Sequence, residues 1–171
     1  MKSTLHLLMG LPGAGKSTLS RVLHELTDAH ILSSDDMRKK IFIKPCFSQD
    51  EHDKLYEILD HNLEHLLEAG KDAIYDANLN RRIHRDEKYE LAGNLDARVI
   101  LWWVDVPKAL AKQRRMSEQD HALLPEGETS ERMFERIALV LEEPTADEPC
   151  IKVDGTKISK SYIKELLANF Y

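Results

Sequence analysis

The chain alternates short apolar runs with longer segments in which apolar residues recur every three or four positions. Residues 5–9 are almost entirely apolar, as in a buried strand, and residues 18–26 place leucine and valine at helical spacing. Alternating strands and helices, with connections long enough for crossovers, predict an α/β protein with a parallel sheet of about five strands and helices on both faces. The other expected strands are 29–32, 72–75, 97–104 and 150–153, and the other expected helices are 37–42, 48–69, 82–91, 107–116, 129–141 and 159–168.

Polar residues mark the starts of two of these helices. Ser34 or Asp35 is expected to cap the helix that begins near residue 37. Ser48 followed by Glu51 has the spelling of a capping box, in which each side chain bonds the backbone N–H of the other residue.

One stretch between a predicted strand and a predicted helix fits the phosphate-binding pattern G-x-x-x-x-G-K-[ST]. Its glycines allow the backbone to curl so that several N–H groups point inward, and the following helix adds the positive end of its dipole. We expect Lys16 to reach the β- and γ-phosphates of ATP and Ser17 to hold Mg²⁺. The pattern predicts a P-loop NTPase fold, and the expected nucleotide-binding residues are Gly10, Leu11, Pro12, Gly13, Ala14, Gly15, Lys16, Ser17 and Thr18.

Length and composition fit one soluble domain that spans residues 1–171. The 171 residues, 42% hydrophobic and 32% charged, are enough to bury a core without metal or disulfide staples. The net charge of -6 argues against long nucleic acid as the favoured partner, although a local arginine cluster can outweigh a global balance. Two cysteines, Cys46 and Cys150, give no disulfide framework, and the longest apolar run, 99–104, is too short to cross a membrane. We therefore expect a cytoplasmic protein, monomeric or homodimeric, with no membrane partner.

Two carboxylates that follow predicted strands are candidates for chemistry at the P-loop. Ligands of open α/β sheets bind at the carboxyl ends of the strands, and both Asp35 and Asp76 are placed there by the predicted elements. We expect Asp35 to act as the catalytic base and Asp76 to hold a water of the metal. An Asx turn is the structural alternative for Asp76, and Asp36 is expected only to cap a helix.

A segment rich in polar residues follows the expected helix at 107–116. Residues 117–129 contain Pro125 and Gly127 and lack periodicity, which predicts a loop or a mobile lid. Arg114 and Arg115 precede this segment, so a closing lid could carry one of them over the γ-phosphate. We therefore expect a small lid at about 114–130. The expected catalytic residues are Asp35, Lys16 and Arg114, the expected metal ligands are Ser17 and Asp76, and the expected substrate-binding residues are Arg38, Asp76, Arg82 and Arg115.

Five stretches resemble a known family. They are Gly-Leu-Pro-Gly-Ala-Gly-Lys-Ser-Thr at 10–18, Ser-Ser-Asp-Asp-Met-Arg at 33–38, Asp-Ala-Asn-Leu-Asn-Arg-Arg at 76–82, Val-Asp-Val-Pro at 104–107 followed by Arg114, and Glu-Glu-Pro-Thr-Ala-Asp-Glu at 142–148. Residues 5 to about 154 are similar to the predicted ATP-binding P-loop kinases related to the 5′-hydroxyl kinase domain of polynucleotide kinase and, more distantly, to zeta toxins.

The resemblance implies a role for four residues: Asp35 as the base, Arg38 in contact with the acceptor, Asp76 in support of the metal or substrate, and Arg114 as the lid arginine. The chain departs from the family pattern at two places. The Asp-x-Thr-Asn of the family becomes Asp76-Ala77-Asn78, which lacks a hydroxyl, and Glu118 stands where an arginine often follows the lid arginine. Arg115 is the residue expected to compensate.

Together these features predict an ATP- and Mg²⁺-dependent kinase that transfers the γ-phosphoryl group to a hydroxyl of a small-molecule or nucleotide-like acceptor. A polynucleotide 5′-hydroxyl kinase is the alternative within the same chemistry. A regulatory nucleotide-binding ATPase is less favoured because no N-K-x-D motif is present and Asp35 and Arg38 would have no role. A toxin-like protein is the remaining alternative, and no sequence feature requires it.

Overall fold

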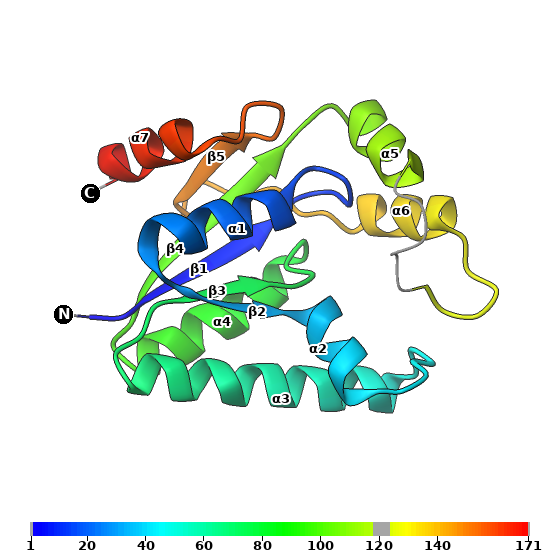
Figure 1. The fold of residues 1–171 in the computed structure, drawn as a ribbon, viewed down its shortest axis with the longest axis horizontal. Helices are drawn as coiled ribbons and strands as arrows, with labels where there is room; N and C mark the ends of the chain where they lie inside the picture. The colour runs from blue at the N-terminus through cyan, green and yellow to red at the C-terminus, as the bar shows by residue number, and fades with distance from the viewer. Residues whose placement is uncertain (1, 118–123, 171) are drawn as a thin grey trace.

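A single parallel sheet organises the computed structural model, which describes residues 2–117 and 124–170. Its five strands lie in the order β2-β3-β1-β4-β5, and helices cover both faces (Figure 1). The α/β fold with a five-stranded parallel sheet that the sequence predicts is therefore confirmed. The strands are β1 (Thr4–Met9), β2 (His30–Ser33), β3 (Ala73–Asp76), β4 (Arg98–Asp105) and β5 (Cys150–Asp154).

The central strand β1 is buried along its whole length. Successive residues of a strand point to opposite faces, so its side chains enter two separate cores. Leu8 belongs to the core beneath α1, α5, α6 and α7, whereas Leu5 and Leu7 pack toward α2, α3 and α4. Burial on both faces explains why this strand is an apolar run without alternation. The helices are α1 (Lys16–Thr27), α2 (Ser34–Ile41), α3 (Gln49–Glu68), α4 (Arg82–Asn94), α5 (Lys108–Ser117), α6 (Ser130–Leu139) and α7 (Lys160–Phe170).

Two helix starts differ in detail from the prediction. The cap of α2 is Ser33, whose hydroxyl accepts a hydrogen bond from the Asp36 N–H at 3.2 Å, so neither Ser34 nor Asp35 has that role. Ser48 caps α3 as expected, but the Glu51 carboxylate does not return to Ser48. It accepts hydrogen bonds from the main-chain N–H groups that precede Ser48, so only half of the capping box forms.

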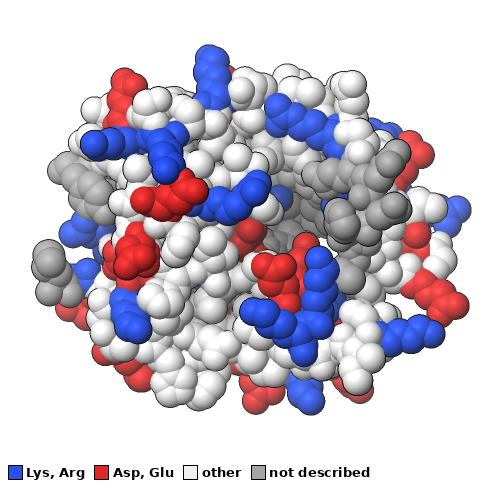
Figure 2. All heavy atoms as spheres, viewed as in Figure 1, with Lys and Arg blue, Asp and Glu red and all other residues white. Residues whose placement is uncertain are grey.

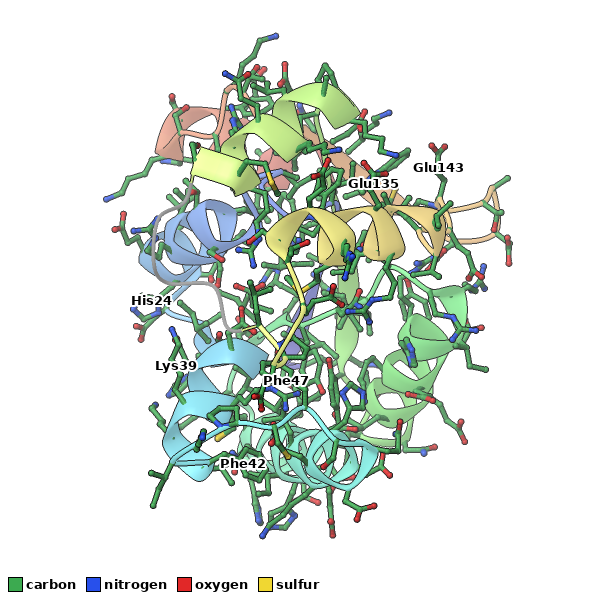
Figure 3. All side chains as sticks on the ribbon, turned by 90° about the vertical axis from the view of Figure 1, so that its right-hand side faces the viewer. His24, Lys39, Phe42, Phe47, Glu135 and Glu143 are labelled. Atoms are coloured by element: carbon green, nitrogen blue, oxygen red, sulfur yellow. The ribbon has the colours of Figure 1, made fainter. Side chains whose placement is uncertain are left out.

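The carboxyl ends of the strands meet at one edge, which carries the candidate site. The P-loop (residues 10–15) follows β1, α2 follows β2, residues 77–81 follow β3, and α5 follows β4. Viewed from this edge, α5 and α6 lie on one side and α2 and α3 on the other (Figure 3). The expected lid at about 114–130 begins inside α5, and its residues 118–123 lie outside the described residues. Within the described chain, every helix is too short or too polar to cross a membrane.

Candidate active site

The P-loop connects β1 to α1 and ends on a glycine. Gly15 occupies the N-cap position of α1 with a φ of 113°, a left-handed conformation that favours glycine. No side chain of the described residues caps this helix, so its first N–H groups can serve an anion. Figure 2 shows a hollow between the P-loop and α2, with acidic and basic side chains gathered around it. The loop can therefore hold a phosphate group at the edge of this hollow.

Lys16 is the first residue of α1, and its side chain turns back onto the P-loop. Its Nζ donates hydrogen bonds to the Gly10 carbonyl oxygen at 2.9 Å and to the Leu11 carbonyl oxygen at 3.1 Å. The ammonium group is thus placed at the loop expected to bind phosphates. A move onto a phosphate would take it away from these two carbonyl groups.

Ser17 and Asp76 come together from α1 and the end of β3. The Ser17 hydroxyl lies close enough to the half-buried Asp76 carboxylate to lower its pKa. Burial raises the pKa of Asp76 above its ordinary value, and the nearby charge of Asp35 raises it further, whereas the charge of Lys16 and the Ser17 hydroxyl oppose the rise. The structure therefore brings Lys16, Ser17, Asp35 and Asp76 into one electrostatic cluster.

The Ser17–Asp76 pair suits a magnesium ion because hydroxyl and carboxylate oxygens are the ligands that Mg²⁺ prefers. Mg²⁺ usually takes one or two such protein ligands and completes its shell with water and substrate phosphates. No cluster of three or more His, Cys, Asp or Glu side chains that could hold a metal occurs in the part of the chain that the structure describes. The pair thus offers oxygen ligands of the kind that Mg²⁺ accepts together with substrate phosphates.

Asp35 and Arg38 lie on α2, on the opposite side of the hollow from the P-loop. Asp35 is exposed in the first turn of the helix, so its carboxylate is accessible to a substrate. Arg38 is buried, forms an ion pair with Glu51, and has its guanidinium carbon 4.6 Å from the centre of the Phe47 ring. Phe47 lies in the lower half of the face seen in Figure 3, beside α2. The charge of Arg38 is thus already matched by a carboxylate on this side of the hollow.

Arg114 and Arg115 lie in the last turn of α5 and pack against the other side of the P-loop. Arg114 donates a hydrogen bond from Nη1 to the Gly155 carbonyl oxygen at 3.1 Å. Gly155 itself touches the loop, because a Cβ atom at this position would lie 2.2 Å from the carbonyl oxygen of Ala14. The main-chain nitrogen of Arg115 approaches Gly13 in the same way, at 3.0 Å from the place of a Cβ atom. The turn after β5 is thus part of the site. Its only signal in the sequence is the single glycine at position 155.

Arg82 is not joined to this cluster. Its guanidinium is half-buried at the start of α4 and forms ion pairs with Asp86 at 2.6 Å, Asp147 at 3.2 Å and Glu148 at 3.6 Å. Within the described residues, no hydrogen bond or ion pair connects Arg82 with the P-loop.

Two further residues of the site escaped the sequence analysis. Tyr56 lies on α3, and burial raises the pKa of its hydroxyl, while the charges of Arg38 and Asp35 are close enough to act on it. Asn80 forms two hydrogen bonds with Gly10 at the start of the P-loop. Tyr56 lies in the predicted helix at 48–69, where an aromatic residue is common and gives no signal of function. Asn80 lies among other polar residues after Asp76, and nothing in the local sequence distinguishes it from them.

A comparison with protein families identifies the chain. The model AAA_33, described as an AAA domain, matches residues 5–144, from β1 through α6. The chain belongs to this AAA domain family. No curated protein matches the AAA domain chain.

Solved structures with the fold of this AAA domain include two kinases and one further nucleotide-bound protein. A sugar kinase from Janibacter sp. HTCC2649, unliganded, is 18% identical with a TM-score of 0.69, covering 97% of this chain and 93% of that chain. The APS kinase CysC of Mycobacterium tuberculosis, in complex with AMPPNP and APS, is 15% identical with a TM-score of 0.73, covering 99% and 98%. Kti12 of Chaetomium thermophilum, in complex with ADP-AlF3, is 17% identical with a TM-score of 0.76, covering 97% and 96%. The chain therefore shares the fold of these structures, which confirms the predicted P-loop NTPase fold.

Proposed function

We propose that this protein is an ATP- and Mg²⁺-dependent kinase that transfers the γ-phosphoryl group to a hydroxyl of a small-molecule or nucleotide-like acceptor. The observation that carries the proposal is the cluster of Lys16, Ser17, Asp76 and Asp35 around the end of the P-loop. A phosphate-binding loop with a carboxylate exposed across from it has the parts that phosphoryl transfer to an alcohol requires.

On the donor side, the main-chain N–H groups of the P-loop and of the first turn of α1 hold the phosphates of ATP. Lys16 leaves the Gly10 and Leu11 carbonyl groups and pairs with the β- and γ-phosphates. Ser17 and Asp76 hold Mg²⁺, which neutralises phosphate charge when it is bound. Arg114 and the turn at Gly155 flank the loop, and this position supports our proposal that the arginine acts on the transferred group. The nucleotides AMPPNP and ADP-AlF3 in two structural neighbours are consistent with this assignment.

On the acceptor side, Asp35 removes the proton of the attacking hydroxyl. The acceptor oxygen forms a bond to the γ-phosphorus in line with the breaking bond to the bridging oxygen, and ADP leaves with that bond's electrons. Arg38 and Arg115 are proposed as charged neighbours of the acceptor. Arg82 would act on it only after releasing the carboxylates that now bind it.

We favour a small acceptor over a polynucleotide because the protein carries a net charge of -6 and contacts to nucleic acid phosphates depend on a basic face. Two structural neighbours, a sugar kinase and an APS kinase, also favour a small acceptor. Cys46 and Cys150 form no disulfide with each other, which is consistent with the cytoplasmic location that we propose.

The experiment that tests the proposal compares Asp35→Asn with Asp36→Asn. Both residues are exposed in the first turn of α2, so the two substitutions remove the same charge from neighbouring positions. Loss of a general base lowers turnover by about 100-fold or more. We expect this loss for Asp35→Asn, with unchanged ATP affinity, and near-normal transfer for Asp36→Asn.

The acceptor is found by incubating labelled ATP with nucleosides, sugars, amino-sugar nucleotides and 5′-hydroxyl oligonucleotides, with the Asp35→Asn protein as the blank. Transfer to the oligonucleotide alone would support the polynucleotide kinase instead. Hydrolysis of ATP that no acceptor changes, at the same rate in wild type and Asp35→Asn, would contradict the kinase and favour a regulatory ATPase.

A further inference from the structure

Asn80 binds both polar main-chain groups of the residue at which β1 ends and the P-loop begins. The Gly10 N–H donates to Asn80 Oδ1 at 2.9 Å, and Asn80 Nδ2 donates to the Gly10 carbonyl oxygen at 3.1 Å. Both bonds are buried, and Asn80 is 3% exposed. The carboxamide therefore provides hydrogen-bond partners for both polar main-chain groups of a buried residue, which water cannot reach well.

Strand β4 prevents Gly10 from moving away from Asn80. A Cβ atom on Gly10 would lie 2.4 Å from the Val104 carbonyl oxygen, so β4 packs directly against the backbone. With Asn80 binding its N–H and carbonyl groups and β4 in contact with the residue, the start of the loop is held firmly.

Asn80 is itself anchored by a buried ion pair. Arg85 donates from Nη1 to the carbonyl oxygens of Leu79 at 3.0 Å and Asn80 at 3.2 Å. The remaining guanidinium nitrogens bind Glu148 through two hydrogen bonds of 2.6 and 2.8 Å, and both side chains are fully buried. The Glu142 N–H also donates to the Asn80 carbonyl oxygen, at 2.8 Å. These contacts give the carboxamide a fixed position relative to the P-loop.

The Gly10 carbonyl oxygen has a second donor, which is Lys16 Nζ at 2.9 Å. Under the function proposed above, this amine has to leave the carbonyl when it pairs with the phosphates of ATP. A buried carbonyl oxygen that loses its donor costs free energy, unless another donor remains. Asn80 Nδ2 is that remaining donor.

We propose that Asn80 is a positioning residue for nucleotide binding. It keeps the Gly10 carbonyl oxygen hydrogen-bonded and thereby allows Lys16 to move to the phosphates. This inference rests on the proposed function, because it assigns Lys16 to ATP. Without the carboxamide donor, the Gly10 carbonyl depends on Lys16 alone, and nucleotide has to compete for the amine.

Two substitutions separate the parts of this role. Asn80→Asp keeps an acceptor for the Gly10 N–H, removes the donor to the Gly10 carbonyl, and adds a negative charge that attracts the Lys16 amine. Asn80→Ala removes both partners. Leaving one buried polar group unpaired on binding corresponds to about tenfold weaker affinity. We expect at least this loss of ATP affinity for both variants, measured by calorimetry with ATP and Mg²⁺.

Asn94→Asp is the matched control, because Asn94 is exposed at the end of α4 and is remote from the P-loop in the chain. It should bind ATP as the wild type does. Near-ultraviolet circular dichroism verifies that each variant is folded before its affinity is compared.

The decisive measurement repeats Asn80→Ala in a Lys16→Met background, which has no amine to release. If Asn80 acts through Lys16, the substitution there changes ATP affinity by less than about twofold, although it costs about tenfold in the wild-type background. Equal losses in the two backgrounds, or full affinity in folded single variants, overturn the inference. A wild-type protein that does not bind ATP refutes the proposed function instead, so the two failures are distinguishable.

Discussion

His6 makes the stability of the protein depend on pH in a way that can be calculated. It lies on the central strand β1, is 1% exposed, and accepts a hydrogen bond on Nδ1 from Trp102 Nε1 at 3.0 Å. Burial lowers the pKa of His6 from 6.5 to about 4, and the charge of Asp72 only partly opposes this. The imidazole is therefore neutral in the folded protein at neutral pH.

The direction of the effect follows from proton binding. The unfolded chain takes up a proton at His6 near pH 6.5 and the folded chain only near pH 4, so stability falls as the pH drops through this window. A shift of 2.5 pKa units (6.5 minus 4) corresponds to about 3.4 kcal/mol in total, of which about 2.5 kcal/mol is lost between pH 7.5 and pH 4.5.

The test is urea unfolding of wild type and His6→Gln at pH 7.5 and pH 4.5. Glutamine offers an oxygen to the Trp102 N–H but does not titrate, so the other ionisable groups contribute equally to both proteins and cancel in the difference. We expect the free energy of unfolding of the wild type to fall by about 2.5 kcal/mol more than that of the variant. An excess below about 1 kcal/mol would show that folding lowers the pKa of His6 by less than about one unit, which would contradict the shift to about 4.

Two further substitutions test the packing around the site. Gly155→Ala places a Cβ atom 2.2 Å from the Ala14 carbonyl oxygen, so it displaces the P-loop and should weaken ATP binding; calorimetry measures this, and an unchanged affinity would mean that the loop is free to move. Arg85→Met leaves the buried Glu148 carboxylate without its closest partner and should lower the free energy of unfolding by about 3–5 kcal/mol in urea. Lys157→Met, which breaks an exposed pair with Asp154, should cost less than about 1 kcal/mol and is the control.

The sheet and the P-loop were predictable because local patterns determine them. The buried strand at β1 is a continuous apolar run, and the glycines, Lys16 and Ser17 of the loop follow one another in the chain. The positions of Asp35 and Asp76 at one edge followed from the rule that parallel strands share their direction. Their roles remain predictions.

The contacts that complete the site could not be predicted, because they join residues far apart in the sequence. Glu51 has the spelling of a capping-box residue, yet it binds Arg38 from the preceding helix. Nothing in the neighbourhood of Arg82 indicates that Asp147 binds it, and the pairing of Asn80 with Gly10 spans seventy positions. In a row of three polar residues, local preference also did not distinguish Ser33 from Ser34 or Asp35 as the helix cap.

The close approach of Gly155 to Ala14 has a consequence for synthesis on the ribosome. β1 and α1 are made before the turn that packs against the phosphate loop, because this turn follows β5. A nascent chain that stops before this turn lacks one wall of the loop. A ligand held by the loop would therefore stabilise a chain that includes the turn more than a shorter fragment.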